Sequence, residues 1–254
     1  MCKIVDTTLR DGEQMAGVEL GFKDKIEFAK IIDSKNVYQI EAGTPAMGGD
    51  EKKSIEELMQ LGLKSKISAW NRMNINDINH SIDCRVDIVH ISVPVSDIQI
   101  KWKLEKDREW VINEMKKSVY YAKEKGYEVI VGLEDASRTS TEFLIDVIKQ
   151  VKALGVSRIR YADTVGILYP EKTFKLITQI KQTLDISIEF HAHNDFGMAV
   201  ANTVAAIRAG SEFVDTTFGG IGERAGNCDY LKLMKVINKN KEVDLLYGDC
   251  SISR

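Results

Sequence analysis

Ser187-Ile-Glu-Phe-His-Ala-His-Asn-Asp195 is a short apolar run that ends in two histidines, and a helical pattern over Met198–Ala209 follows it. Side chains alternate between the two faces of a β-strand, so His191 and His193 point the same way. The stretch therefore predicts a strand followed by a helix, with two imidazoles side by side where the strand ends.

The same strand-then-helix unit repeats along the whole chain. The predicted strands are Lys3–Thr8, Tyr38–Glu41, Lys66–Trp70, Asp87–Val93, Glu128–Leu133, Ser157–Ala162, Ser187–Ala192 and Phe213–Thr217. The predicted helices are Lys23–Ser34, Ser54–Leu61, Ile75–Asp83, Asp107–Lys125, Thr141–Leu154, Glu171–Thr183, Met198–Ala209 and Asp229–Asn238. This alternation is typical of a parallel α/β fold.

The number of units and the chain length favour a closed (β/α)₈ TIM barrel over an open sheet. An open sheet that binds a dinucleotide usually has a glycine-rich turn after its first strand, and Asp11-Gly-Glu-Gln14 does not match that turn. We expect one catalytic barrel domain over residues 1–247 and a short polar tail over 248–254.

Composition excludes several classes of protein. The chain has 254 residues, of which 44% are hydrophobic, and a formal net charge of −3, so no general nucleic-acid interaction is expected. No apolar run reaches the roughly 18 residues of a membrane-spanning helix. The scattered cysteines, without a Cys-x-x-Cys pair, are typical of a reducing cytoplasm, and no signal-peptide core precedes the first strand.

Polar residues follow each predicted strand. In a barrel of this class the carboxyl ends of the strands build the active site. The side chains concerned are Arg10, Asp11, Glu13, Gln14, Glu41, Thr44, Asn71, Arg72, His90, Ser92, Ser96, Asp97, Glu134, Asp135, Arg138, Asp163, Thr164, His191, His193, Asn194 and Asp195, with a glycine-rich loop over 219–227. The pattern predicts a polar site at one end of the barrel.

The two histidines are candidate ligands of a divalent cation. Asp11 is the natural carboxylate partner because closure brings the first strand near the seventh, and Asn227 can add a carbonyl oxygen. Such a nitrogen and oxygen shell suits Mg²⁺, Mn²⁺, Zn²⁺ or Fe²⁺. The alternatives are a pair of solvent-facing histidines and an Asp11 that only caps a turn.

Arginine beside a Lewis acid indicates carbonyl chemistry. Arg10 and the cation together can stabilise an alkoxide that develops on a 2-oxo acid, although an ion pair with Glu41 is the alternative. Arg138 can bind a second substrate carboxylate, and Glu134 can position a hydroxyl or pair with Arg138. Thr164 can donate to the first carboxylate or be an ordinary hydroxyl at a strand end.

Taken together, these residues resemble the metal-dependent acyl-CoA-condensing family that includes 2-isopropylmalate synthase and homocitrate synthase. The matching motifs are Asp6-Thr-Thr-Leu-Arg-Asp-Gly-Glu-Gln14, Ile40-Glu-Ala-Gly-Thr-Pro-Ala46, Leu133-Glu-Asp-Ala-Ser-Arg138, Ala162-Asp-Thr-Val-Gly166, His191-Ala-His-Asn-Asp195 and Gly222-Glu-Arg-Ala-Gly-Asn227. Within the family, Thr44–Glu51 and Val89–Asp97 look most like the nitrogen-fixation type of homocitrate synthase.

The resemblance implies a (β/α)₈ barrel with Mg²⁺, Mn²⁺ or Zn²⁺ held by Asp11, His191 and His193, with Asn227 close by. The resemblance also implies that Arg10 polarises the keto group, that Thr164 binds the acid and that Glu134 helps organise the site. The implied reaction is a Claisen condensation of the co-substrate acetyl-CoA with a 2-oxo acid, most plainly 2-oxoglutarate, to give (R)-homocitrate.

Members of this family continue past the barrel into a C-terminal region that supplies a histidine to the neighbouring subunit. That region is absent from the sequence, and neither His80 nor His90 is a convincing replacement. We therefore expect an oligomer in which a second subunit supplies the missing region, so that the chain is the catalytic subunit of a split synthase.

Four other functions compete with this reading. A related lyase cleaves 3-hydroxy-3-methylglutaryl-CoA with a cysteine in the glycine-rich loop, but Gly219–Glu223 has none and Cys228 follows Asn227. A 2-isopropylmalate synthase would need an apolar pocket for a branched acceptor. Non-haem iron oxygenases share the two-histidine, one-carboxylate set on an all-β scaffold. A non-catalytic subunit that binds metal and keto acid is the alternative from another class.

Overall fold

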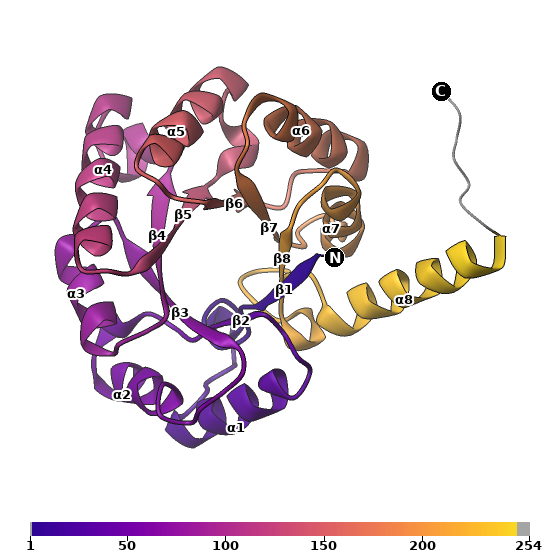
Figure 1. Cartoon of the computed structure of the whole chain (residues 1–254), viewed down its shortest axis with the longest axis horizontal. Helices are drawn as coiled ribbons and strands as arrows, with labels where there is room; N and C mark the ends of the chain where they lie inside the picture. Colours follow the sequence, from indigo (N-terminus) through magenta and orange to yellow (C-terminus); the bar gives the residue numbers. More distant parts are fainter. Residues whose placement is uncertain (1, 248–254) are drawn as a thin grey trace.

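The eight strands pair in chain order, all parallel, and β8 pairs with β1 to close the barrel. The computed structural model describes residues 2–247, with helices surrounding the strands (Figure 1). The strands are β1 Lys3–Asp6, β2 Gln39–Glu41, β3 Lys66–Arg72, β4 Ile88–Pro94, β5 Glu128–Glu134, β6 Arg158–Asp163, β7 Ser187–Ala192 and β8 Phe213–Thr216. The predicted single-domain barrel is confirmed.

A helix follows each strand on the outside of the barrel. The helices are α1 Phe22–Asp33, α2 Gly49–Leu58, α3 Ile75–Asp83, α4 Arg108–Glu124, α5 Thr141–Ala153, α6 Pro170–Thr183, α7 Ala199–Arg208 and α8 Tyr230–Tyr247. A π-helical segment, Gln99–Lys103, lies between β4 and α4. All eight predicted helices are confirmed, with differences at their ends.

Several ends differ from the prediction, and three of them have local reasons. Strand β1 stops at Asp6 because the Thr7 carbonyl turns inward to accept N–H groups from Arg10, Asp11 and Gly12. Helix α2 starts at Gly49 rather than Ser54, and acidic residues in its first turn favour that start. Helix α8 continues from Asn238 to Tyr247, since no glycine or proline interrupts that stretch.

Along β2 and β7, polar side chains alternate with apolar side chains that pack in the core under the helices. In β6, Arg158 and Arg160 face the inside of the barrel, whereas Tyr161 packs outside, stacked on Phe190 of β7 with ring centroids 6.0 Å apart. The apolar outer faces bury the strands under the helices, and this packing supplies the hydrophobic stabilisation. The inward positions are therefore free to carry charges.

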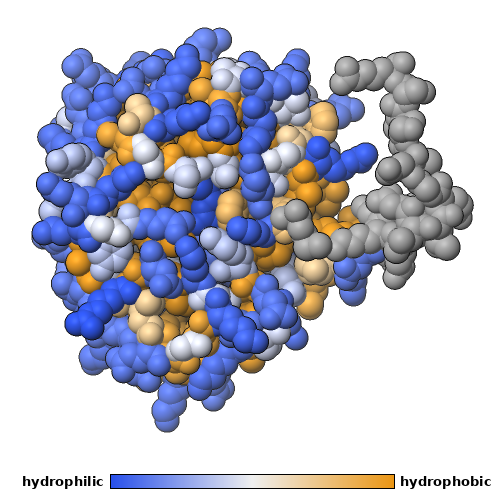
Figure 2. Space-filling view, viewed as in Figure 1, coloured by the Kyte–Doolittle hydropathy of each residue, from blue (hydrophilic) through white to orange (hydrophobic). Residues whose placement is uncertain are grey.

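Figure 1 shows α8 leaving the ring of helices, and the view down the barrel in Figure 2 shows hydrophobic residues between hydrophilic ones. Within residues 2–247, no helix combines the length and the apolar character that crossing a membrane requires. Cys2, Cys84 and Cys228 are free thiols. Cys250 and the predicted tail over 248–254 lie outside the described residues.

Candidate metal centre and active site

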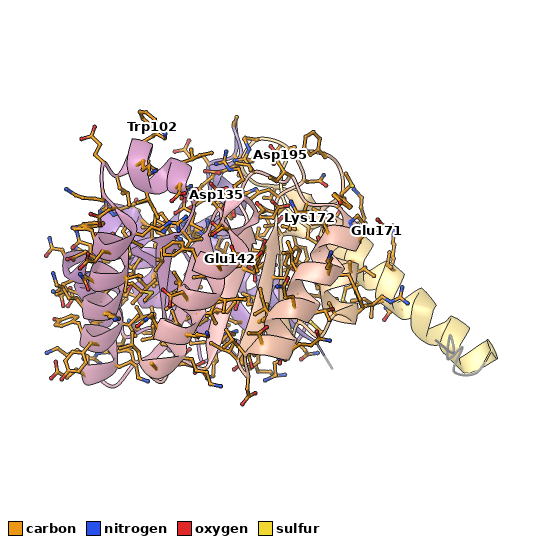
Figure 3. All side chains as sticks on the ribbon, turned by 90° about the horizontal axis from the view of Figure 1, so that it is seen from above. Trp102, Asp135, Glu142, Glu171, Lys172 and Asp195 are labelled. Carbon is orange, nitrogen blue, oxygen red and sulfur yellow. The ribbon has the colours of Figure 1, made fainter. Side chains whose placement is uncertain are left out.

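The loops that follow the strands gather at one end of the barrel. Figure 3 shows Trp102, Asp135 and Asp195, which follow β4, β5 and β7, toward this same end. A pocket of about 230 Å³ opens there. Six of the eight predicted site residues line it: Arg10, Asp11, Glu134, Thr164, His191 and His193.

Asp11, His191 and His193 form a buried cluster whose candidate ligand atoms all lie within 4.8 Å of one another. Asp11 Oδ2 is 3.0 Å from His191 Nε2 and 3.7 Å from His193 Nε2, and the two Nε2 atoms are 3.3 Å apart. The strand alternation of β7 brings the imidazoles together, and the turn after β1 brings the carboxylate. The structure thus unites the three predicted ligands.

Several buried polar atoms in this cluster have no hydrogen-bond partner among the described residues. They are Asp11 Oδ1, His193 Nδ1 and Asn227 Oδ1. Asn227 pairs with His193 in an isolated bridge and donates its Nδ2–H to the Ile221 carbonyl at 3.1 Å, which leaves Oδ1 free. Convergent nitrogen and oxygen donors with unmade bonds fit a divalent cation.

The protonation of the cluster follows from its burial and charges. Burial favours the neutral form of His191, but hydrogen bonds to Asp11 and Asp215 outweigh it and raise its pKa to about 9. Burial and the charge of His191 lower the pKa of His193 to about 4. Burial opposes ionisation of Asp11, yet Arg10 and His191 hold its pKa below the usual range. A divalent cation held by this cluster would displace the proton from His191.

Arg10 contacts both residues that the sequence suggested for it. Its Nε donates to Glu41 Oε1 at 2.6 Å, and its Nη1 is 3.4 Å from Asp11 Oδ2. Burial opposes its charge, but Glu41 and Asp11 raise its pKa. Arg10 can therefore pair with Glu41 and still lie beside the candidate ligands. Glu41 fixes the guanidinium, which lines the pocket.

Glu134 is held at the pocket wall by donors from β4 and the π-helical segment. Its carboxylate accepts from Ser92 at 3.2 Å, Gln99 at 2.8 Å and Lys103 at 3.3 Å. The alternative in which Glu134 pairs with Arg138 is wrong, since the Arg138 guanidinium binds Asp135 at 2.6–2.9 Å.

Arg138 and Asn227 are the two predicted residues that do not line the pocket. The guanidinium of Arg138 is paired with Asp135, whereas Asn227 forms an isolated backbone bridge with His193. Thr164 does line the pocket, and its Oγ1 accepts the Asp135 N–H at 2.8 Å. Its hydroxyl hydrogen therefore remains available to a ligand.

The prediction missed most of the charged residues inside the barrel. His90 Nδ1 lies 2.6 Å from Glu41 Oε2, and burial, reinforced by Arg160, lowers its pKa to about 4. Arg160, Glu189 and Asp215 lie next to this pair. The signal was the alternation of charged with apolar residues in Arg158-Ile-Arg160 and Glu189-Phe-His191, which is unusual for strands buried on both faces.

Comparisons with known proteins find relatives over nearly the whole chain. The HMGL-like family model matches residues 1–247. The chain is 58% identical over 246 residues to homocitrate synthase subunit alpha of Clostridium pasteurianum, covering 97% of this chain and 91% of that protein. It is 47% identical to 2-isopropylmalate synthase 2 of Caldanaerobacter subterraneus and 43% identical to homocitrate synthase 1 of a Nostoc species.

Coverage differs among these relatives. The matches to the Caldanaerobacter and Nostoc proteins include 95% of this chain but only 63% and 64% of the relatives' length. Among solved structures, an HMG-CoA lyase from Bacillus subtilis superposes with a TM-score of 0.82 at 16% identity, covering 100% of this chain and 96% of that one. At this identity the likeness supports the barrel fold.

Proposed function

The chain belongs to the HMGL-like family, and we propose that it catalyses the condensation of acetyl-CoA with 2-oxoglutarate to homocitrate. The observation that carries the proposal is the buried Asp11–His191–His193 cluster with the Arg10 guanidinium beside it. The 58% identity to a homocitrate synthase subunit selects this reaction within the family.

The donor set fits a divalent cation, with Asp11, His191 and His193 as ligands and Asn227 close by. Such a cation supplies Lewis-acid polarisation of a keto oxygen. Arg10 donates hydrogen bonds toward the same oxygen and stabilises the negative charge that forms on it. The free Thr164 hydroxyl donates to the carboxylate of the acceptor, and Glu134 orients polar groups at the opposite wall.

The reaction consumes acetyl-CoA, 2-oxoglutarate and water, and yields homocitrate, free CoA and a proton. A base takes a proton from the acetyl methyl group, and the resulting carbanion forms a carbon–carbon bond to the keto carbon, whose π electrons move to the oxygen next to Arg10. Hydrolysis of the thioester then releases CoA and makes the sequence irreversible.

We propose that a second subunit supplies the base. The three pocket histidines of the described residues are engaged: His191 and His193 in the cluster and His90 with Glu41. The relative from Clostridium pasteurianum is described as a subunit alpha, which supports the same arrangement here. The scattered free thiols are compatible with a cytoplasmic location for this enzyme.

The test follows CoA release with a thiol reagent, with Mn²⁺ present and with 2-oxoglutarate or 2-oxoisovalerate as acceptor. We expect 2-oxoglutarate to be preferred and a candidate second subunit to raise the rate. A preference for 2-oxoisovalerate would favour the 2-isopropylmalate reaction that the Caldanaerobacter relative is named for. Binding of 2-oxoglutarate without CoA release under any partner condition would favour the non-catalytic alternative.

A lyase reaction that depends on a loop cysteine is not supported. Cys228 is buried and its pKa is raised to about 12 by burial. No cysteine of residues 2–247 lines the pocket. The similarity to solved HMG-CoA lyases therefore concerns the fold rather than the reaction.

A further inference from the structure

One arginine inside the barrel contacts three carboxylates from three other strands. Arg160 of β6 is 3% exposed, and its Nε lies 2.5 Å from Glu189 Oε1 and 2.9 Å from Asp215 Oδ2. Its two terminal nitrogens donate to Glu41 at 3.1 and 2.7 Å. Arg160 thus links β2, β7 and β8, and it also lines the pocket.

Two of these carboxylates hold residues of the site. Asp215 Oδ2 lies 2.8 Å from Nδ1 of His191, whose Nε2 belongs to the metal cluster. Glu41 Oε1 accepts the Nε–H of Arg10 at 2.6 Å. The guanidinium of Arg160 therefore sits between the carboxylate that orients a candidate metal ligand and the carboxylate that orients the arginine beside it.

We propose that Arg160 is a positioning residue that sets the geometry of the metal site and of Arg10 together, acting through Asp215 and Glu41. The proposal rests on the proposed function for the roles of Arg10 and the metal. A planar guanidinium offers donors in a fixed fork, so it fixes the directions of both carboxylates, whereas a lysine ammonium acts as a point charge.

Removing Arg160 leaves the carboxylates of Glu41, Glu189 and Asp215 close together in a region shielded from water. Unpaired buried carboxylates repel one another and must move apart. This movement alters the acceptor that Asp215 presents to His191. Groups that orient metal-ligating histidines in this way usually contribute 10- to 100-fold to metal affinity.

Arg158 provides a matched control on the same strand. It also faces the barrel interior, is 4% exposed and lies 3.0 Å from Glu189. Its other hydrogen-bond and ion-pair partners among the described residues are Gln39 at 2.7 Å and Glu128 at 3.8 Å, and neither lines the pocket. Arg158 therefore shares the burial and charge of Arg160 but not the links to Asp215 and Glu41.

The test compares Mn²⁺ binding by calorimetry for the wild-type chain, Arg160→Met and Arg158→Met, without acetyl-CoA or any acceptor. We expect Arg160→Met to weaken Mn²⁺ binding about 10- to 100-fold and Arg158→Met to change it by less than about 3-fold. Thermal unfolding monitors the stability that both variants lose. Equal affinity of Arg160→Met and wild type, or an equal loss in both variants, would overturn the proposal.

A conservative pair keeps the test decisive if the methionine variants do not fold. Arg160→Lys retains the charge without the fork, so we expect weaker Mn²⁺ binding than in Arg158→Lys and a lower kcat with a smaller change in KM. Mn²⁺ affinity in Arg160→Lys as high as in Arg158→Lys would contradict the proposal. Because binding is measured without substrates, a wrong assignment of the condensation reaction would leave this result unaffected.

Discussion

Asp215 Oδ2 lies 2.8 Å from Nδ1 of His191, and Nε2 of the same imidazole lies 3.0 Å from Asp11 Oδ2. A carboxylate that accepts the Nδ1–H fixes the tautomer of the ring and leaves the Nε2 lone pair for a cation. The relationship places the proton and the ligand atom of His191 on opposite sides of the ring.

Replacing Asp215 with asparagine should therefore weaken metal binding with almost no change in side-chain volume. The amide removes the negative charge that orients His191, so we expect Mn²⁺ affinity to fall about 10- to 100-fold in calorimetry. Asp83→Asn is the control, because Asp83 pairs with Lys52 on the exterior and is 59% exposed. Wild-type affinity in Asp215→Asn would show that this carboxylate does not orient the ligand.

Arg10 should affect catalysis more than metal binding. Arg10→Met removes the donor that faces the developing oxyanion, so we expect kcat to fall about 10²- to 10³-fold, with Mn²⁺ affinity changing far less. Steady-state CoA release, under the conditions in which the wild type is active, measures kcat. The exposed Arg108, which pairs with Asp97, serves as control. A kcat within a few-fold of wild type would remove Arg10 from the reaction.

Lys25 holds the turn that carries Arg10 and Asp11. It is 2% exposed, and its ammonium donates to the Leu9 carbonyl at 3.2 Å, to Glu13 at 2.9 Å and to Glu51. Glu51 in turn accepts the Thr44 N–H at 2.7 Å. This buried cation ties α1 and α2 to the two loops that form one side of the pocket.

Lys25→Met should lower the free energy of unfolding by about 3–5 kcal/mol, because two partly buried carboxylates lose their partner. Lys52→Met, which breaks the more exposed pair with Asp83, should cost less than about 1 kcal/mol. Urea unfolding at neutral pH measures both values. Similar losses in the two variants would mean that Lys25 does not stabilise the turn through its ion pairs.

The burial of Asp6 leads us to expect a specific pH dependence of the free energy of unfolding. Its side chain is buried, Oδ1 accepts the Thr8 N–H at 2.9 Å, and Oδ2 has no partner among the described residues. Burial raises its pKa to about 7 from 3.8. The folded state therefore holds this proton more tightly than the unfolded state, so the stability it contributes is complete below pH 4 and is lost as the pH rises toward 7.

Asp6→Asn removes this titration and keeps the acceptor for Thr8. We expect the free energy of unfolding of the variant, relative to wild type, to rise by about 4 kcal/mol between pH 4 and pH 8, as roughly three pKa units require. Urea unfolding over this pH range tests the difference between the two proteins. Parallel pH profiles would show that Asp6 is ionised at neutral pH despite its burial.

Periodicity was sufficient to predict the barrel, since each apolar run is short, β-branched and followed by a helical pattern. The metal cluster was also predictable, because His191 and His193 lie two residues apart in a strand and closure brings β1 to the strands at the end of the chain. These inferences use local spacing and the geometry of a closed sheet alone.

The charged interior was not predictable in the same way. Which acid pairs with Arg160 depends on the relative heights of β2, β6, β7 and β8, a register that no single segment encodes. A similar difficulty affected Arg138, which pairs with Asp135 in the same turn and does not line the pocket. Sequence adjacency suggested Glu134 instead, but β5 ends at Glu134, and the left-handed backbone of Asp135, with φ of 62°, starts the turn that carries Arg138.

The most direct test of the account is the position of Mn²⁺, located by anomalous scattering in crystals of the chain grown with Mn²⁺ and 2-oxoglutarate. We predict one peak at roughly 2.0–2.3 Å from a carboxylate oxygen of Asp11 and from Nε2 of both His191 and His193, with the keto acid beside Arg10. A fully occupied Mn²⁺ elsewhere, with these three side chains bound only to one another, would contradict the account.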